Sequence, residues 1–427
     1  MSTALRRGHD PVLVIGGGVV GLSVAYYLAA KGVPVEVVER RSVASGASWG
    51  NAGWVCASHS APVPAPGVIR YAVGSLGRPD SPLYLRPAPD PSLLRWLWRF
   101  WRSSKASAFR AGYTAVADLN QPTFDLFAGL AEAGVDTTLT RPGLVHAFLS
   151  ADQARHHLDV QRAMADGRYD VPDGVLTGSE AAGLDPALSS AVQAAYLVEG
   201  EGVVDPGRLV TALADAVTRL GGRITEKVEV TGFRRTADGT VVGAVTEYGE
   251  IPCAGVVVAA GIWSRELARL LGHRLPLQAG KGYSFSVELD PAPRHAMYFG
   301  DKRIVASPIG GITRIAGTME LSGNNNDLDW RRIVAIARGS RHYLGPWFHH
   351  PDELVGLIRD PWVGGRPFLP DGLPVIDRLP GIGNAFVATG HGMLGVTLGP
   401  ATGTAVTDYI LTGARPDVLA PFGFGRL

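Results

Sequence analysis

The stretch from Val12 to Arg40 constrains the fold of this chain more than any other. It reads VLVIGGGVVGLSVAYYLAAKGVPVEVVER. A short apolar run meets three consecutive glycines, an alanine- and leucine-rich run follows, and a second apolar run ends in Glu39. This order predicts a strand, a tight turn, a helix and a second strand, which together form the opening unit of a nucleotide-binding sheet.

Three glycines in this stretch have the spacing G-x-G-x-x-G. Gly16 permits a sharp exit from the strand, Gly18 lets a pyrophosphate approach the backbone, and Gly21 lets the helix pack closely on the sheet. The helix N-terminus offers free N–H groups and the positive end of its dipole to phosphates. Glu39 can accept hydrogen bonds from both ribose hydroxyls and would repel a 2′-phosphate. The stretch therefore predicts a dinucleotide site and argues against NADP.

The same stretch allows one alternative, a membrane-spanning helix, because residues 11–30 carry no charge. A spanning helix needs about 20 apolar residues. Three adjacent glycines would weaken such a helix at its middle by about 1 kcal/mol each. A buried parallel strand followed by a close-packed helix explains the lack of charge better.

Length and charge narrow the class of protein. A chain of 427 residues is too long for one ordinary core, so two domains are expected. A formal net charge of +1 leaves no broad electrostatic footprint for nucleic acid. Cys56 and Cys253 stand far apart and predict neither a disulfide framework nor a zinc site. The opening MSTALRRGHD leaves no room for the apolar region of a signal peptide, so we expect a cytoplasmic protein.

The segment LLRWLWRFW, residues 93–101, interleaves tryptophan with arginine. We favour a helix that packs Trp96, Trp98 and Trp101 inward and leaves the arginines outside. The alternative is a patch on the membrane surface, because aromatic and arginine side chains suit that interface. Such a patch would place the protein at the inner face of the membrane.

Later segments complete the predicted fold. Asp205 and Pro206 are the residue types expected at the N-cap and first position of a helix. A meander is expected over 227–234, 240–247 and 250–258, a hairpin turn at Gly310-Gly311, a strand over 384–389 and a helix over 396–410. The fold class is α/β (α+β), with a Rossmann-type nucleotide domain from residues 1–90, 196–272 and 362–427. Residues 91–195 and 273–361 form a second domain with a large antiparallel sheet.

These segments resemble the FAD-dependent D-amino acid oxidase superfamily, and within it the D-amino acid dehydrogenase small subunits. The matching stretches are VLVIGGGVVGLSVAYYLAAKG, GASWGNAG, APGV, GVVDPGRL, VVVAAGIWS, GKGYSF, RIAGTMEL, GGRPFLPDGLPVID and NAFVATGHGMLGVTLGPATG. They run in order along nearly the whole chain. The resemblance implies an FAD-binding domain and a substrate domain with a large antiparallel sheet. The chain departs from the family where Trp54 and Cys56 follow NAG, which bears on substrate preference and not on the fold.

The resemblance implies FAD as the cofactor and assigns contacts to it along the chain. The residues so implied are Gly16, Gly18, Val19, Val20, Gly21, Glu39, Arg40, Ala47, Ser48, Asn51, Ala52, Gly53, Val228, Gly261, Trp263, Gly390, His391, Gly392, Met393, Leu394 and Gly395. The N-terminus of the last helix would stabilise the negative charge of reduced flavin by roughly 0.3–2 kcal/mol. No cysteine lies in the C-terminal loop, so we expect non-covalent FAD.

The implied reaction transfers hydride from the α-carbon of an amine to flavin N5, and the imine then hydrolyses to an oxo acid. No metal is required. A substrate carboxylate calls for a guanidinium, which binds it in a two-pronged way. Arg366 in G-G-R-P is our candidate, and the alternative is a structural arginine that ties its loop to the sheet. Arg303 and Arg314 are second choices.

Two tyrosines and two histidines are further candidates. Tyr283 and Tyr298 could add a hydroxyl to the carboxylate or amine, or could pack as half-buried strand residues. His391 could accept a proton, bond the cofactor, or satisfy backbone groups of its own loop. His59 is a weaker candidate.

Three functions are open from the sequence. The first is a D-amino acid dehydrogenase that passes electrons to a quinone or another acceptor. The second is an oxidase or dehydrogenase of glycine, sarcosine or a cyclic imino acid such as D-hydroxyproline. The third is a catalytically silent flavin-binding subunit of a larger complex. The motifs specify neither the accepted side chain, nor the acceptor, nor the oligomeric state.

Overall fold

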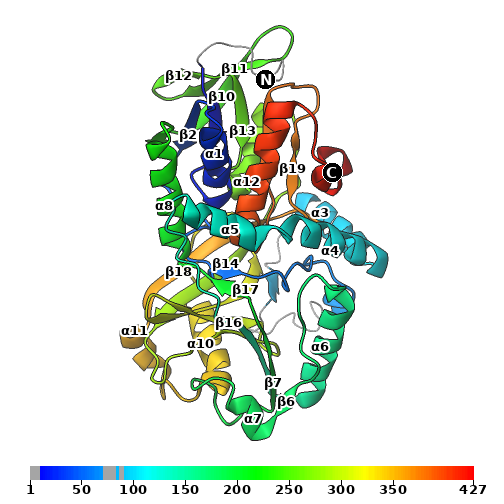
Figure 1. Ribbon diagram of the computed structural model, residues 1–427, viewed down its shortest axis with the longest axis vertical. Coiled ribbons are helices and arrows are strands. Elements are labelled where there is room, and N and C mark those ends of the chain that lie inside the picture. Colours follow the sequence, from blue (N-terminus) through cyan, green and yellow to red (C-terminus); the bar gives the residue numbers. More distant parts are fainter. Residues whose placement is uncertain (1–9, 71–82, 86–90) are drawn as a thin grey trace.

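A computed structural model of the chain describes residues 10–70, 83–85 and 91–427. Two sheets organise these residues, one towards each end of the molecule (Figure 1). The six-stranded sheet lies at the top of the view and the nine-stranded sheet at the bottom. The residues before Asp10, on which the prediction about a signal peptide rests, lie outside the described part.

The six-stranded sheet is of the nucleotide-binding type. Its order is β19-β20-β13-β1-β2-β9, and every neighbouring pair is parallel except β19 with β20. The strands are β1 Val12–Ile15, β2 Val35–Glu39, β9 Arg223–Glu226, β13 Gly255–Val258, β19 Val375–Arg378 and β20 Ala385–Thr389. Because β1, β13 and β20 come from the beginning, middle and end of the chain, this sheet forms only when distant segments meet.

Three helices pack on one face of this sheet: α1 Val19–Ala30, α8 Pro206–Arg219 and α12 Gly395–Thr412. A Cβ on Gly403 would lie 2.7 Å from the backbone of Ser23, so glycine allows α12 to approach α1 closely. Helix α8 begins as predicted. Asp205 accepts hydrogen bonds from the N–H groups of Gly207 and Arg208 at 3.0 and 3.1 Å, and Pro206 is the first helical residue.

A three-stranded meander covers the other face together with α9 Ser264–Leu270. Its strands are β10 Val230–Arg235, β11 Val241–Thr246 and β12 Gly249–Pro252. The predicted third strand over 250–258 was wrong in its extent, because β12 ends at Pro252. The N–H of Ala254 then donates to the carbonyl of Pro11 at 3.0 Å, and β13 continues as a parallel strand beside β1.

The nine-stranded sheet has the order β18-β14-β17-β16-β15-β5-β7-β6, with β4 paired to β17. All pairs are antiparallel except β15 with β5 and β17 with β4. The bounds are β4 Leu83–Leu85, β5 Leu144–Phe148, β6 Leu176–Thr177, β7 Ala194–Val198, β14 Gln278–Val287, β15 Ala296–Phe299, β16 Ile304–Ile309, β17 Ile312–Leu321 and β18 Arg359–Phe368. The predicted fold class, with one parallel and one mostly antiparallel sheet, is confirmed.

Local features of this larger sheet also follow the sequence. Gly310 and Gly311 have φ angles of 59° and 83°, as a tight turn between β16 and β17 requires, so the predicted hairpin is confirmed. Helix α10 Trp330–Leu344 packs on one face. The opposite face meets the nucleotide-binding half, where Ser284 Oγ donates to the carbonyl of Gly50 at 2.5 Å.

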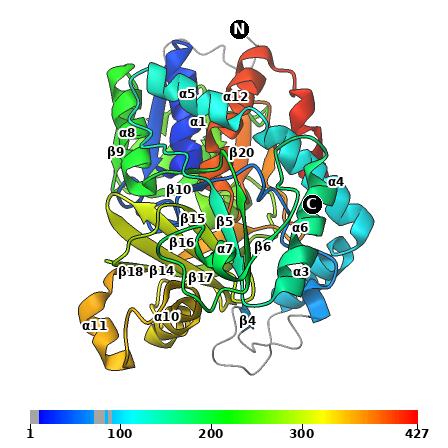
Figure 2. The ribbon, with the colours of Figure 1, turned by 60° about the horizontal axis from the view of Figure 1, so that its bottom comes forward.

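Helices α3 Pro91–Ser103, α4 Ala106–Asn120 and α6 Ala151–Ala165 lie along one side of the molecule (Figures 1 and 2). Shorter helices are α5 Thr123–Glu132, α7 Gly178–Ala182 and α11 Leu354–Leu357, and β3 Trp54–Val55 pairs with β8 Gly202–Val203. In α3, Trp96 is buried, but Trp98 and Trp101 are 53% and 56% exposed, so the prediction that all three pack inward was wrong. Within the described residues, no helix is long and apolar enough to cross a membrane.

The proposed boundaries between two domains stay a prediction. Two strands of the nine-stranded sheet run across them, because β7 spans residue 196 and β18 spans residue 362. We therefore propose that the second domain includes all of β7 and β18. Arg366 on β18 then belongs to the second domain, and its side chain extends into the cavity that faces the nucleotide-binding half.

Candidate active site

A cavity of about 1520 Å³ separates the two sheets. The C-terminal ends of β1, β2, β13 and β20 form one wall, as expected of an open parallel sheet. The wall on the other side comes from β14, β16, β17 and β18. Residues 44–48 and 50–54, the start of α12, the segment after β3, and helices α3 and α6 also line the space between these walls.

The glycine turn after β1 has the conformation that its motif predicts. Gly16 has φ +120°, and a Cβ there would lie 2.6 Å from the carbonyl oxygen of Ala259. Gly18 lines the cavity as the N-cap of α1, so the N-cap residue has no side chain to cap the helix, and the first turn carries no acidic residue. Gly21 does not line the cavity. It faces the carbonyl of Gly16, where a Cβ would overlap, so it serves the close packing of α1 on the turn.

Ser48 closes over the start of α1 from the following loop. Its Oγ accepts a hydrogen bond from the N–H of Val19 at 3.0 Å and would lie 3.1 Å from a Cβ at Gly18. Val20 also lines the cavity at this helix end. These small groups leave the helix N-terminus accessible to an anion from the cavity.

Glu39 stands at the tip of β2. Its Oε2 accepts from the N–H of Gly17 at 2.8 Å and its Oε1 from the N–H of Arg41 at 2.9 Å. Each oxygen has a further lone pair, so the carboxylate is held in place and can still accept from a ribose hydroxyl. The N–H of Val228 already donates to the carbonyl of Glu39 at 3.0 Å. We therefore propose that the carbonyl of Val228 accepts a hydrogen bond from the adenine.

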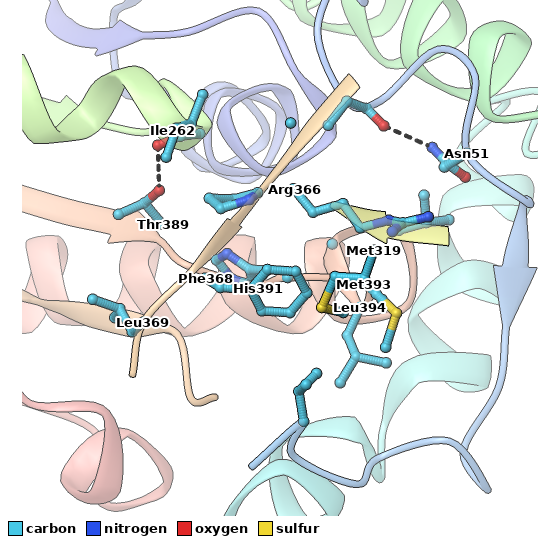
Figure 3. Close-up of a pocket in the computed structure, with 18 of the residues that line it drawn as sticks. Asn51, Ile262, Met319, Arg366, Phe368, Leu369, Thr389, His391, Met393 and Leu394 are labelled. Atoms are coloured by element: carbon cyan, nitrogen blue, oxygen red, sulfur yellow. Dashed lines mark hydrogen bonds between the residues drawn. The ribbon is translucent and has the colours of Figure 1, made fainter. Parts of the chain in front are cut away.

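Arg40 and Trp263 flank the same end of the cavity. The guanidinium carbon of Arg40 lies 4.1 Å from the centre of the Trp263 indole, which is a cation–π contact. Gly261, with φ +55°, lines the cavity beside them, and its carbonyl accepts from Thr389 Oγ1 at 2.8 Å (Figure 3). This contact ties the end of β13 to the end of β20.

The loop with Ala47, Ser48, Asn51, Ala52 and Gly53 lines the middle of the cavity. Asn51 donates to the carbonyls of Ala47 and Ser48 at 3.2 and 3.1 Å and accepts from the N–H of Gly53 at 2.8 Å. Its amide therefore shapes the loop. Arg314 does not line the cavity and instead donates to two carbonyls of this loop, Trp49 and Asn51, both at 3.3 Å.

The loop before α12 meets the cavity through His391, Gly392, Met393, Leu394 and Gly395, whereas Gly390 packs on Leu369 behind them (Figure 3). The Nε2 of His391 lies 3.0 Å from Thr402 Oγ1. Burial lowers the pKa of His391 to about 3. The imidazole is therefore neutral near pH 7 and unsuited to take up a second proton there. The start of α12 carries no acidic residue in its first turn, so its positive end faces the cavity unopposed.

Arg366 enters the cavity from β18. Its guanidinium passes over Gly282 of β14, where a Cβ would overlap it, and its Nη1 donates to the carbonyl of Thr318 at 3.0 Å. Among the described residues, no carboxylate forms an ion pair with Arg366, and burial alone lowers its pKa to about 10. The group stays protonated near pH 7. It is thus a partly buried positive charge without a protein counter-charge, beside Met319 and Met393 (Figure 3).

Tyr283 borders the cavity, but its side chain packs in the apolar core between the large sheet and α10, and its hydroxyl is used there. The hydroxyl donates to Glu320 Oε2 at 2.9 Å. Lys281 and Arg332 lie 3.6 and 3.5 Å from the same carboxylate. Burial and the Glu320 carboxylate raise the pKa of Tyr283, so the hydroxyl remains a donor to Glu320.

A match to a known family adds to this geometry. Residues 11–409 match the profile of the DAO family, described as FAD dependent oxidoreductase. The chain belongs to this family. It is 32% identical over 421 residues to a D-amino-acid oxidase of Bradyrhizobium diazoefficiens, covering 96% of this chain and 97% of that protein. It is 31% identical over 423 residues to a D-amino acid dehydrogenase of Xanthobacter autotrophicus, covering 95% and 96%.

The fold of this FAD-dependent oxidoreductase is also that of solved structures. Glycine oxidase from Geobacillus kaustophilus superposes with a TM-score of 0.76 at 23% identity, covering 98% of this chain and 99% of that one. FAD is the cofactor of this family, as the match over residues 11–409 shows, and the cavity fits it. The accessible end of α1, the carboxylate of Glu39 and the positive end of α12 lie along one continuous space.

The attachment of FAD stays a prediction, and the cysteines bear on it. Cys56 lines the cavity, and Cys253 is buried away from it. Burial and the neighbouring Glu201 carboxylate raise the pKa of Cys56, and burial raises that of Cys253 to about 12. Both are neutral thiols, which are poor nucleophiles. This supports non-covalent FAD.

A ring cluster lies at the far side of the cavity, and the sequence motifs indicated Tyr298, His59 and Trp54 but not His146, His157 and Tyr196. Tyr298 packs at right angles to Trp54, His59 and His146, with centroids 6.4, 5.5 and 5.6 Å away. His157 and Arg303 lie beside it in the cavity wall. One signal was available, since His146 stands in the apolar strand LVHAF, where an unexplained polar side chain points to a site.

Proposed function

We propose that this oxidoreductase oxidises the Cα–N bond of a D-amino acid. The observation that carries the proposal is the guanidinium of Arg366, which has no carboxylate partner among the described residues and lies in a cavity continuous with the dinucleotide site. An anionic group of a substrate supplies the missing counter-charge, and a carboxylate matches the guanidinium in a two-pronged way. Relatives named D-amino acid dehydrogenase and oxidase support the choice of substrate class.

The side chains of this chain would bind and orient the substrate. FAD, when bound, supplies the acceptor of the hydride that leaves the α-carbon. Arg366 fixes the carboxylate, and so fixes where the α-hydrogen points. The N-terminus of α12 provides N–H groups and a positive dipole end for negative charge that develops next to it. Neutral His391 forms a hydrogen bond with Thr402 of α12 and so holds the loop before α12 in place.

The electron acceptor is either a quinone or another carrier, as in a dehydrogenase, or oxygen, as in an oxidase. We propose the dehydrogenase. Glycine, sarcosine and cyclic imino acids form the second candidate class, because the TM-score of 0.76 to a glycine oxidase shows that this fold can house such an activity.

The test is an anaerobic screen of the purified holoprotein. D-amino acids, glycine, sarcosine and D-hydroxyproline are added under nitrogen, and loss of the oxidised flavin absorbance is followed. We expect D-amino acids to bleach the flavin fastest. Bleaching only by glycine, sarcosine or D-hydroxyproline would transfer the proposal to that class, and no bleaching by any of them would indicate a silent flavin-binding subunit. Oxygen uptake without added acceptor then separates oxidase from dehydrogenase.

A further inference from the structure

One row of residues crosses the face of the nine-stranded sheet that borders the cavity. Ala316 on β17 pairs with Val305 on β16, and Val305 pairs with Tyr298 on β15. Tyr298 in turn pairs with His146 on β5, and His146 with Tyr196 on β7. Directly paired residues share a face of a sheet. The row therefore begins with small side chains and ends in three rings.

Other segments add rings to the end of this row. Trp54 stands on β3, His59 lies in the loop after β3, and His157 comes from α6. His59 stacks on His146 at 5.4 Å with 9° between the planes, and His146 stacks on Tyr196 at 4.6 Å with 8°. We call Trp54, His59, His157 and Tyr298, which line the cavity, the ring wall. His146 and Tyr196 support it from behind.

The ring wall is uncharged near pH 7. Burial lowers the pKa of His59 to about 3 and that of His157 to about 4, and it places the pKa of His146 well below its usual range. The Nδ1 of His157 lies 2.6 Å from the hydroxyl of Tyr196. Both ring nitrogens of His146 and the Nε2 of His59 lack hydrogen-bond partners among the described residues. Unpaired buried nitrogens lower stability, so the cluster is poorly explained as a stabilising core.

The ring wall lies within reach of a ligand held by Arg366. The hydrogen bond to Thr318 places the guanidinium above β17. Tyr298 stands on β15, two strands further along the sheet, and its row crosses β17 at Ala316, two residues from Thr318. At the usual spacings this corresponds to about 10 Å across the strands and about 7 Å along them. The floor between them is made of Ala316 and Val305. A methyl side chain would leave this gap open, whereas a ring on a methylene would approach the wall.

We propose that the ring wall binds the side chain of the substrate and selects D-amino acids that carry an aromatic ring. The inference rests on the proposed function and adds the substrate class. The ring wall should bind an aromatic side chain more tightly than an aliphatic one, because edge-to-face and offset-stacked contacts add to the free energy gained by burying apolar surface. The four rings themselves give no ion pair to an acidic side chain, and Arg303 beside them is the cation that D-glutamate tests. D-phenylalanine, D-tyrosine and D-tryptophan are therefore preferred over D-alanine, D-leucine and D-glutamate.

The first experiment measures anaerobic flavin reduction by these six amino acids across concentration. We expect the apparent dissociation constant for D-phenylalanine to be at least tenfold lower than for D-alanine and lower than for D-leucine. In Tyr298→Ala and His59→Ala, the ratio between D-alanine and D-phenylalanine should fall towards one. Tyr298→Phe keeps the ring and should keep the ratio. If Tyr298→Ala fails to hold FAD, Tyr298→Leu, which fills the space without a ring, replaces it.

A second experiment does not depend on turnover. The holoprotein is titrated with 3-phenylpropionate and with propionate, and binding is followed by the change in the flavin absorbance spectrum. We expect 3-phenylpropionate to bind at least tenfold more tightly, and this advantage should shrink in Tyr298→Ala. The two carboxylates differ only in the ring, so the ratio reports the wall and not the guanidinium.

The outcomes separate the two proposals. If D-alanine, D-leucine or D-glutamate binds as tightly as D-phenylalanine, the ring wall is not the side-chain site, although the D-amino acid function stands. If D-glutamate binds most tightly of the six, Arg303 would be the residue that binds the substrate side chain. If the ratio of dissociation constants between D-alanine and D-phenylalanine is unchanged in both Tyr298→Ala and His59→Ala, the inference is also overturned. If no D-amino acid reduces the flavin, the proposed function fails, and equal binding of the two propionates would then overturn the ring wall as well.

Discussion

At the scale of single residues, the charge of Arg366 matters most, because nothing in the described protein neutralises it. Lysine keeps the charge but loses the two-pronged geometry. We expect Arg366→Lys to weaken substrate binding and slow flavin reduction by about 10- to 100-fold together, since charged hydrogen bonds contribute about 1.5–3 kcal/mol each. Anaerobic stopped-flow reduction of wild type and variant across substrate concentration measures both quantities.

The FAD content of Arg366→Lys should stay normal, because the residue stands on the substrate side of the cavity. Arg303→Lys is the matched control, as Arg303 also lines the cavity. Equal kinetics of Arg366→Lys and wild type would make Arg366 a structural residue. A defect in Arg303→Lys alone would move the carboxylate site to that residue.

Glu39 offers a second test at this scale. Removing its carboxylate in Glu39→Ala takes away the proposed ribose contact and the hydrogen bond to Gly17. We expect the dissociation constant of FAD to rise about 10- to 100-fold, which corresponds to about 1.4–2.8 kcal/mol. Fluorescence titration of the apoprotein with FAD measures it. Glu247→Ala, at an exposed carboxylate that does not line the cavity, should change the constant by less than about threefold.

At the scale of elements, the contact between α1 and α12 decides how the positive end of α12 meets the cavity. Alanine normally favours a helix over glycine by about 1 kcal/mol. At Gly403, however, a Cβ would lie 2.7 Å from the backbone of Ser23, and overpacking costs about 1–3 kcal/mol. We therefore expect Gly403→Ala to lower the free energy of unfolding, measured by urea denaturation with FAD bound.

Gly129→Ala in α5 is the matched control, and its effect on the free energy of unfolding should have the opposite sign. Gly129 is exposed, and a Cβ there meets no atom of the described structure within 4 Å. This substitution should raise the free energy of unfolding by up to about 1 kcal/mol. If both variants are stabilised, the two helices can move apart freely, and close packing of α12 is not what positions the cavity.

At the scale of the whole molecule, FAD would bridge the two halves of the chain, because the cavity is lined from both sheets. A ligand that binds only the folded protein adds stability, by about 2.7 kcal/mol at a concentration 100 times its dissociation constant. We expect the apoprotein to unfold at a lower temperature than the holoprotein and to recover on addition of FAD. Differential scanning fluorimetry at increasing FAD concentration measures this shift.

The attachment of FAD is tested on the same preparation. Precipitation with acid should release all colour into the supernatant, because the thiol of Cys56 is neutral and no other cysteine lines the cavity in the described part. Colour that remains in the pellet would reveal a covalent link. Cys56→Ser would then show whether that residue carries it.

The sequence by itself determined the features that depend on neighbours along the chain. The glycine turn after β1, the cap at Asp205 and the turn at Gly310-Gly311 require particular backbone conformations, and those leave a clear residue pattern. The family motifs also pointed to Arg366 and to the loop before α12. These predictions needed no knowledge of which segments meet.

Only the tertiary structure decided features that depend on distant partners. The strand predicted to end at 258 breaks after Pro252 because Ala254 pairs with Pro11. Arg366 has no carboxylate partner in the described part of the chain because of what the other strands place around it. The ring wall forms only where β15, β3 with the loop after it, and α6 converge. The contacts of Pro11 with Ala254 and of His59 with Tyr298 join residues more than two hundred positions apart, and no run of neighbouring residues in the sequence specifies them.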